Sequence, residues 1–381
     1  MNTTIYSGVH MTSITFYPLG NADCCLIKTT LGNVIAFDFA DMHVPDDRYD
    51  RRMPLAANFK QDIGWPNRKD VDVLAITHGD NDHIKGIPDT FWLDHAAKYQ
   101  STERIKIKEM WVPAALICDP EAEDDCKIIR AEAQFRFLNK KGIRVFSRPE
   151  HLKDWVEKRG KKLDDFRDII TDAGRLVPGW TKEAQGIEFF VHSPFAEHTE
   201  DGLLDRNDNC LVMQATIREA GLDTRFVMTA DSTWENWQKM VNITKKHGND
   251  EKLAWDVFKI PHHGSYLSMA AEKGDWMTTP TEEFKWLLEQ GAERAVMVSS
   301  SWEVEMADDP DDVQPPHVQT HRRYQKTADE KDAELIITME NPSKNQPKRT
   351  QVEVSGTGAS LKKVAAMAVT AITSSQAPRV G

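Results

Sequence analysis

The sequence predicts a layered α/β fold with a site at the carboxyl ends of its strands. Residues 71–76 form an apolar run typical of a buried strand, and a loop with two histidines and two aspartates, residues 77–83, follows at once. Far downstream, the predicted strand 257–261 runs in the same way into His262 and His263. In layered α/β folds, loops at the carboxyl ends of strands are where sites are built. The repeated order of strand, sharp loop and histidine therefore predicts both the fold class and the place of its site.

The residue types at these strand ends predict a metal centre. A third predicted strand, residues 224–230, ends in Asp231. Imidazoles and carboxylates are ligands of divalent metals, and clustering them costs repulsion and desolvation unless a cation lies among them. We expect two divalent ions that share one carboxylate bridge. The predicted ligands are His78, Asp80, Asp82, His83, Asp231 and one or both of His262 and His263.

Bulk composition bounds the class of protein. The chain has 381 residues, of which 40% are hydrophobic and 28% charged, as is ordinary for a globular protein. Its net charge of −12 argues against a broad electrostatic grip on nucleic acid, although a local basic groove is compatible with it. The five cysteines are odd in number and form no C-x-x-C pair, so we expect them to be reduced. With no signal-peptide pattern and no apolar run of about 18 residues, the expected location is the cytoplasm, without a membrane segment.

The remaining elements follow from local patterns, in chain order. Apolar or alternating runs predict strands at residues 14–17, 24–27, 34–37, 110–112, 143–146, 187–191, 211–217, 225–229, 256–260, 295–299, 333–339 and 352–354. Helices are predicted at residues 86–98, 122–140 and 282–290, and loops at residues 41–52 and 308–316. A further helix is expected after Asp231, capped by Ser232 or Thr233, because Trp237 and Val241 fall on one face with Trp234.

The ordered motifs resemble the metallo-β-lactamase superfamily, and within it the branch found as the soluble domain of the ComEC-type competence DNA-uptake channel. Residues 78–83, His-Gly-Asp-Asn-Asp-His, resemble the signature His-x-(His/Asp)-x-Asp-His, with the aspartate at the second ligand position that is typical of this branch. Residues 259–265, Lys-Ile-Pro-His-His-Gly-Ser, resemble its "KxxHHGS" ending. Further elements in the family's order are matched by residues 17–23, 37–38, 207–212 and 229–231. The resemblance covers roughly residues 12–300.

This resemblance implies a four-layered αββα sandwich of the metallo-β-lactamase type. Residues 1–355 would form one hydrolase domain, and residues 356–381 a C-terminal tail with disorder as the default expectation. Residues 99–185, which carry dense charge runs of both signs, are the expected insertion or elaboration over the site. The channel-forming membrane segments of the competence protein are absent from this sequence.

The resemblance also implies the ligand sets of the two metal ions. His78, Asp80 and Asp231 would hold the first ion. Asp82, His83, Asp231 and one of His262 and His263 would hold the second. Zinc is the expected metal. Manganese is the alternative, because Asp80 in place of a histidine makes the first site harder.

The sequence departs from the family pattern at four places. Ala22 and Ala230 stand where glycine is usual, which matters only if a positive φ is needed there, and Cys210 replaces a serine. The third histidine that completes the first metal site has no clear counterpart, and His192 and His198 are weak candidates for it.

The leading functional hypothesis is a metal-dependent phosphodiesterase or nuclease that uses a metal-bound hydroxide, with nucleic acid or a small phosphodiester as its partner. Asp82 would be catalytic, and His317, with His321 beside it, could donate a proton or hold a phosphate with Arg322 or Arg323. The alternative for this segment is a surface helix start with incidental histidines.

Two other functions stay open at this point. One is a hydrolase of a small ester, lactone or thioester, which an apolar pocket would favour. The other is a non-catalytic metal-bearing module of a larger assembly. Ser265 either binds substrate or caps a helix, and capping is the expected role.

Overall fold

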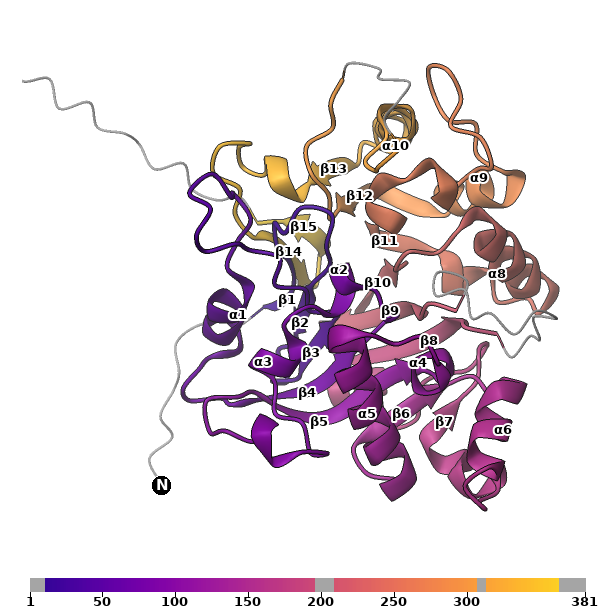
Figure 1. The fold of residues 1–381 in the computed structure, drawn as a ribbon. Helices are drawn as coiled ribbons and strands as arrows, with labels where there is room; N and C mark the ends of the chain where they lie inside the picture. The colour runs from indigo at the N-terminus through magenta and orange to yellow at the C-terminus, as the bar shows by residue number, and fades with distance from the viewer. Residues whose placement is uncertain (1–10, 196–208, 307–312, 363–381) are drawn as a thin grey trace, which may run out of the picture.

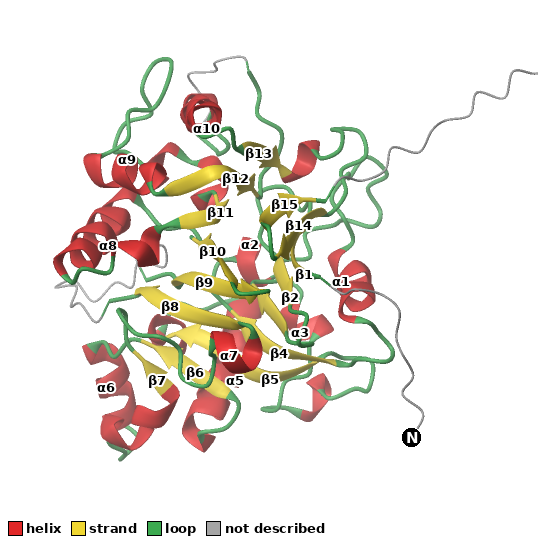
Figure 2. Ribbon diagram, turned by 180° about the vertical axis from the view of Figure 1, so that it is seen from behind, coloured by secondary structure: helices red, strands yellow, loops and turns green. Residues whose placement is uncertain are grey.

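Two β-sheets pack face to face, and helices cover the outer face of each (Figures 1 and 2). The structure is a computed structural model that describes residues 11–195, 209–306 and 313–362. This arrangement is the four-layered αββα sandwich that the sequence implies, in the α/β class.

The first sheet has nine strands within the described residues, in the order β15-β14-β1-β2-β3-β4-β5-β6-β7. Its strands are β1 (Thr12–Phe16), β2 (Cys25–Lys28), β3 (Val34–Phe37), β4 (Asp70–Ala75), β5 (Lys106–Pro113), β6 (Ile143–Phe146), β7 (Ile170–Thr171), β14 (Thr350–Ser355) and β15 (Gly358–Leu361). The pairs from β15 to β3 are antiparallel, whereas β3 to β7 run parallel to one another. The carboxyl ends of β3 and β4 therefore lie at the same edge of the sheet.

The second sheet has six described strands, in the order β13-β12-β11-β10-β9-β8. Its strands are β8 (Ile187–Ser193), β9 (Val212–Glu219), β10 (Leu222–Met228), β11 (Trp255–Lys259), β12 (Gly291–Ser299) and β13 (Glu334–Ile337). Strands β10 to β13 are parallel, so β10, β11 and β12 also end side by side.

The core between the sheets consists of the alternate side chains that point inward from both. Phe37 and Trp111 of the first sheet meet Phe189 of the second, with ring centroids 5.0 to 6.5 Å apart. Strands buried on both faces read as continuous apolar runs, which is why residues 34–37 and 71–76 carry so few polar side chains.

Helices cover the two outer faces because each presents an apolar stripe to its sheet. On the first sheet lie α1 (Leu55–Ile63), α2 (Asn81–Ile84), α3 (Ile87–Thr90), α4 (Ala114–Cys118), α5 (Asp124–Asn139) and α6 (Glu150–Glu157). On the second lie α8 (Trp234–Lys246), α9 (Glu282–Glu289) and α10 (Val318–Glu330), and the short α7 (Lys182–Gln185) precedes β8. Helix α8 begins as predicted, because the Thr233 hydroxyl accepts a hydrogen bond from the Asn236 amide.

The structure differs from the sequence-based expectation in two segments, residues 86–98 and residues 356–362. The helix predicted over residues 86–98 is wrong: α3 ends at Thr90, and Phe91 forms a β-bridge with Ile105 that buries its ring. The charged segment 99–185 supplies β5, β6 and β7 to the first sheet, and the strands predicted at residues 110–112 and 143–146 lie within β5 and β6. The expected tail from residue 356 contributes β15, which pairs with β14, and residues 363–381 lie outside the described part of the chain.

Among the described residues, no helix combines the length and the apolar character that crossing a membrane requires. No disulfide joins the cysteines of the described residues.

The inter-sheet core makes a first prediction. Trp111→Ala should lower the free energy of unfolding by about 3–5 kcal/mol, because the substitution empties a fully buried position between the sheets. Trp276→Ala is the matched control, since the Trp276 side chain is 69% exposed and should cost less than about 1 kcal/mol. Urea denaturation followed by circular dichroism measures both, and equal losses for the two variants would contradict this account of the core.

Candidate metal centre

Side chains from both sheets meet at one edge of the sandwich. His83 lies in α2, directly after β4 of the first sheet, and Asp231 and His263 follow β10 and β11 of the second. Asp23 joins them from the loop that precedes β2. The four residues are buried, and each offers a ligand atom that lies within 4.8 Å of the others. We call Asp23, His83, Asp231 and His263 the central cluster.

The Asp231 carboxylate lies between two imidazoles. Its Oδ1 is 3.2 Å from His83 Nε2, and its Oδ2 is 3.5 Å from His263 Nε2. Asp82 joins from the rim, where its half-buried carboxylate places Oδ2 3.1 Å from His263 Nε2. The carboxylate that the sequence assigns as a bridge is thus the one at the middle of the group.

His78 and Asp80 form a second pair beside the central cluster. His78 Nε2 lies 3.4 Å from Asp80 Oδ2, and the His78 and His83 rings are 4.0 Å apart between centroids. The two groups lie next to each other, as a two-ion arrangement requires.

The structure distinguishes the two adjacent histidines. His263 is buried inside the central cluster, whereas His262 Nε2 is 3.9 Å from Asp231 Oδ2 and its side chain is 22% exposed. His263 is therefore the better placed metal ligand, and the partly exposed His262 lies at the border of the central cluster.

Left-handed backbone conformations aim these side chains. His262 and His263 have φ of 49° and 53°, and Ala230 and Asp38 have φ of 49° and 56°. Such values cost a non-glycine residue roughly 1–2 kcal/mol each and gather at functional sites. Ala230, where the family has glycine, thus does adopt a positive φ.

Hydrogen bonds from outside the cluster fix both imidazoles. Asp38, at the end of β3, accepts from the Thr77 amide and hydroxyl at 2.7 Å each and from His83 Nδ1 at 2.8 Å. His263 Nδ1 donates to the Ser300 carbonyl at 2.8 Å. In both rings Nε2 is left to face the Asp231 carboxylate, which is the ring orientation that metal-binding histidines have.

The charges of the cluster depend on one another. Burial lowers the pKa of His83, but Asp231 and Asp38 outweigh burial and raise it well above its usual value. Burial also opposes protonation of His263, yet Asp231 and Asp82 raise its pKa to about 10. Burial raises the pKa of Asp231, and the two imidazoles reverse that and lower it. Without a metal the imidazoles act as the counter-ions of the carboxylates.

The residues present fit a divalent metal. His78 Nε2, His83 Nε2 and Asp231 Oδ1 are buried and make no well-directed hydrogen bond, which is costly for polar atoms unless another partner takes them. Imidazole nitrogens and carboxylate oxygens at this spacing are a donor set for zinc or manganese.

The downstream candidates lie outside the central cluster. His317 is buried at the start of α10, where its backbone N–H donates to the Gly264 carbonyl at 3.2 Å and its Nδ1 accepts from the Tyr266 amide at 3.4 Å. His321 is partly buried in the first turns of α10, and burial lowers its pKa. Arg322 lies over the Trp276 ring, 3.4 Å from the centroid.

Arg323 is partly buried in the same helix. The Ser265 hydroxyl accepts from the Leu267 amide at 3.3 Å, as a helix cap does.

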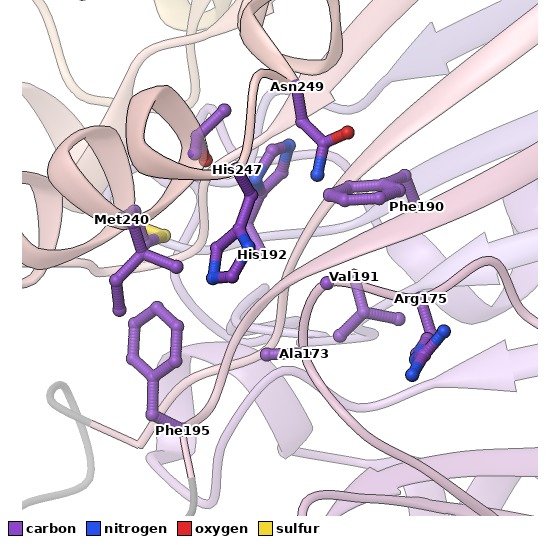
Figure 3. Close-up of a pocket in the computed structure, with 12 residues that line it drawn as sticks. Ala173, Arg175, Phe190, Val191, His192, Phe195, Met240, His247 and Asn249 are labelled. Atoms are coloured by element: carbon purple, nitrogen blue, oxygen red, sulfur yellow. The ribbon is translucent and has the colours of Figure 1, made fainter.

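His192 is not part of the central cluster either. It is buried in β8, where its Nε2–H donates to the Lys252 carbonyl at 2.8 Å. Its ring borders a separate cavity of about 530 Å³, together with Phe190, Met240 and His247 (Figure 3). His198 and residues 207–208 of the Asn-x-x-Ser-like element lie outside the described residues.

Sequence reasoning left three residues of the site without a role. Asp23 and Asp38 were matched to family elements but not assigned a function, and Lys259 was noted only as the first residue of the "KxxHHGS" element. For Asp38 the available signal is its place directly after an apolar strand, whereas Asp23 and Lys259 have no such local signal.

The chain resembles known proteins in structure but not in sequence. No family model and no curated protein sequence matches this chain. Solved structures that resemble it include yeast PDE1, with 10% identity over 86% of this chain and 98% of that one and a TM-score of 0.42. A β-lactamase from Chitinophaga pinensis matches with 13% identity over 87% and 94% and a TM-score of 0.32.

A long form RNase Z from yeast matches with 14% identity over 87% of this chain and 45% of that one, at a TM-score of 0.36. These TM-scores are low, so the comparisons carry no conclusion about function.

The Asp38 network makes a prediction about metal affinity. Asp38→Ala should weaken metal binding about 10–100-fold, because His83 loses the partner that fixes its ring. Asp38→Asn should weaken it less, since asparagine tolerates the positive φ and still accepts one hydrogen bond. Competition with a chromogenic chelator measures both. Asp72→Asn, which alters a β4 carboxylate that binds Arg68 and Lys108, is the control and should bind metal as the wild type does. Unchanged affinity in Asp38→Ala would refute the orienting role.

His192 makes a prediction about acid stability. Burial lowers its pKa from 6.5 to about 4, so the unfolded state binds the extra proton as pH falls through this window, and stability is lost. His192→Gln should therefore lose less stability than the wild type between pH 6.5 and pH 4, by roughly 3 kcal/mol at most. Urea midpoints across this pH range measure the difference. His247→Gln, at the exposed end of α8, is the control, and parallel curves for wild type and His192→Gln would show that the burial of His192 has no such effect.

Proposed function

We propose that this chain is a metal-dependent hydrolase whose substrates are phosphodiesters. The observation that supports the proposal is the central cluster itself, where buried imidazoles and carboxylates from both sheets bring their ligand atoms within 4.8 Å of one another. A structural role alone gives no reason to bury three ionisable side chains around the Asp231 carboxylate.

In the proposed site, His83, Asp231 and His263 would hold one divalent ion, with Asp82 at the rim. His78, Asp80 and Asp231 would hold a second. Such ions, when bound, neutralise charge on a phosphoryl oxygen and lower the pKa of a water toward about 7. The protein's own contribution is orientation. Asp38 and the Ser300 carbonyl fix the rings of His83 and His263, and the half-buried carboxylate of Asp82 lies at the rim of the central cluster.

We propose His317 as the residue that supplies a proton to the leaving group. Its Nδ1 accepts from the Tyr266 amide, so the neutral ring carries its proton on Nε2, as a proton donor requires. The hydrogen bond from the His317 backbone N–H to the Gly264 carbonyl ties the backbone of His317 to the turn that bears His263.

Phosphodiesters are favoured over other substrates by the donor set. Carboxylate-rich sites suit harder ions, and phosphate oxygens are the substrate atoms that such ions bind. The second candidate is a hydrolase of small esters, lactones or thioesters. A narrow recess beside His78 is lined by Pro113, Ala115 and Leu116 together with Asp119 and Asn209, and its volume of about 10 Å³ is too small for an acyl group, so it does not favour this candidate.

Finer assignments belong to the same proposal. The order of the sequence motifs supports the ComEC-like branch. Zinc is the proposed metal with manganese as the alternative. The cytoplasm is the proposed compartment, as the odd number of cysteines without a C-x-x-C pair indicates. Nucleic acid or a small phosphodiester is the proposed partner.

An activity assay tests the proposal. Protein loaded with zinc or manganese should hydrolyse bis(4-nitrophenyl) phosphate, DNA or RNA in preference to 4-nitrophenyl acetate or a lactone. Asp82→Ala and Asp231→Asn should lower kcat at least about 100-fold, because removing a ligand costs several kcal/mol of charge stabilisation. Asp72→Asn should leave kcat unchanged. No turnover with any metal, or full turnover in Asp82→Ala, would sink the proposal, and preference for the acyl substrates would favour the second candidate.

A further inference from the structure

A buried ion pair crosses between the sheets next to the central cluster. Lys259, the last residue of β11, is only 5% exposed, and its Nζ lies 2.7 Å from Oδ2 of Asp23, which is itself 3% exposed. Lysine is almost never buried this deeply unless it is paired, so the pair needs an explanation.

Pairing with Lys259 does not satisfy Asp23. The other carboxylate oxygen, Oδ1, is buried and makes no hydrogen bond. The carboxylate is aimed at the cluster, with Oδ2 3.8 Å from His83 Nε2. The backbone N–H of Asp23 donates to the Asp82 carbonyl at 2.8 Å, which fixes Asp23 against the metal loop.

A second buried pair in the same protein shows what a purely structural pair looks like. Glu132 and Arg136 in α5 are also fully buried. Both Glu132 oxygens are satisfied, because Oε1 accepts from Arg136 Nε and the Asp94 amide, and Oε2 accepts from the His95 amide and ring. Asp23 lacks this complement, because its Oδ1 is buried without a hydrogen-bond partner, while its carboxylate offers a ligand atom within 4.8 Å of those of His83, Asp231 and His263.

We propose that Asp23 is a further metal ligand and that Lys259 is the positioning residue that holds it in place. The inference rests on the metal site of the proposed function. The ammonium of Lys259 fixes one oxygen of the carboxylate, as hydrogen bonds to ligating carboxylates commonly do, and aims the group at His83.

Charge balance explains why a buried lysine is needed there. Asp23, Asp80, Asp82 and Asp231 bring four negative charges, which the two ions of the proposed site would balance when both are bound. Lys259 compensates Asp23 while either ion is absent, which removes the cost of an uncompensated buried carboxylate.

The enlarged donor set bears on the identity of the metal. With Asp23 the central cluster and Asp82 offer three carboxylates and two imidazoles, which exceeds the four ligands that zinc takes in its usual tetrahedral sites. An oxygen-rich set of this size suits a harder ion of higher coordination number, such as Mn²⁺.

Metal affinities of paired variants test the inference. In Asp23→Asn combined with Lys259→Met, both buried charges are removed together, so the fold is not left with an unpaired ion. The affinity for Mn²⁺, measured by equilibrium dialysis and by the electron paramagnetic resonance signal of the bound ion, should fall about 10–100-fold. The affinity for Zn²⁺ should fall less. Glu132→Gln combined with Arg136→Met is the matched control, and it should bind both metals as the wild type does.

The outcomes separate this inference from the proposed function. If the double variant is folded and binds Mn²⁺ and Zn²⁺ like the wild type, the pair is structural and the inference is overturned while the metal site stands. If the wild type binds neither metal, both fail. Should the double variant not fold, Asp23→Asn alone replaces it, because its amide oxygen still accepts from Lys259. Unchanged Mn²⁺ affinity in that variant overturns the inference in the same way.

Discussion

The contact of the Asp231 carboxylate with His83 and His263 is the interaction on which this site depends. Asp231 and His263 follow strands of the second sheet and His83 follows a strand of the first, so the contact joins the two sheets at their common edge. A buried carboxylate is stable only with a positive partner. In the metal-free protein the imidazoles fill that role, and a bound cation would replace their protons. Metal binding is therefore coupled to proton release and to the stability of the sandwich edge.

Precision at the site comes from groups that never reach its centre. Asp38 and the Ser300 carbonyl hold the outer nitrogens of the two rings, so each ring has one orientation. The left-handed residues Ala230, His262 and His263 make the chain turn sharply where the strands stop. Strain of this kind persists only where the surroundings fix it, and the carboxyl ends of β10 and β11, which lead into these turns, are buried. The rigid core between the sheets is thus what permits a strained edge.

The parts of the fold that the sequence predicts are those encoded by local patterns. Residues 34–37 and 71–76 are apolar because their strands are buried on both faces, and the polar residues that follow them mark the strand ends. The loop 77–83 carries its ligands within one short segment, so its composition alone indicates a metal. The prediction of a helix over residues 86–98 is wrong for the opposite reason. The β-bridge between Phe91 and Ile105 is a contact between separate segments, and it outweighs the local helical preference.

What the sequence could not predict depends on contacts between distant segments. His262 and His263 have nearly the same positive φ, so the backbone conformation does not distinguish them, and no side-chain pattern encodes which ring turns inward. The pairing of Asp23 with Lys259 requires the two sheets to be packed already, since one residue belongs to each. A buried lysine beside three carboxylates has no local signature, yet it decides how much negative charge the site can hold. The charge balance of a metal site is therefore a property of the packed sandwich and cannot be read from the ligand motif alone.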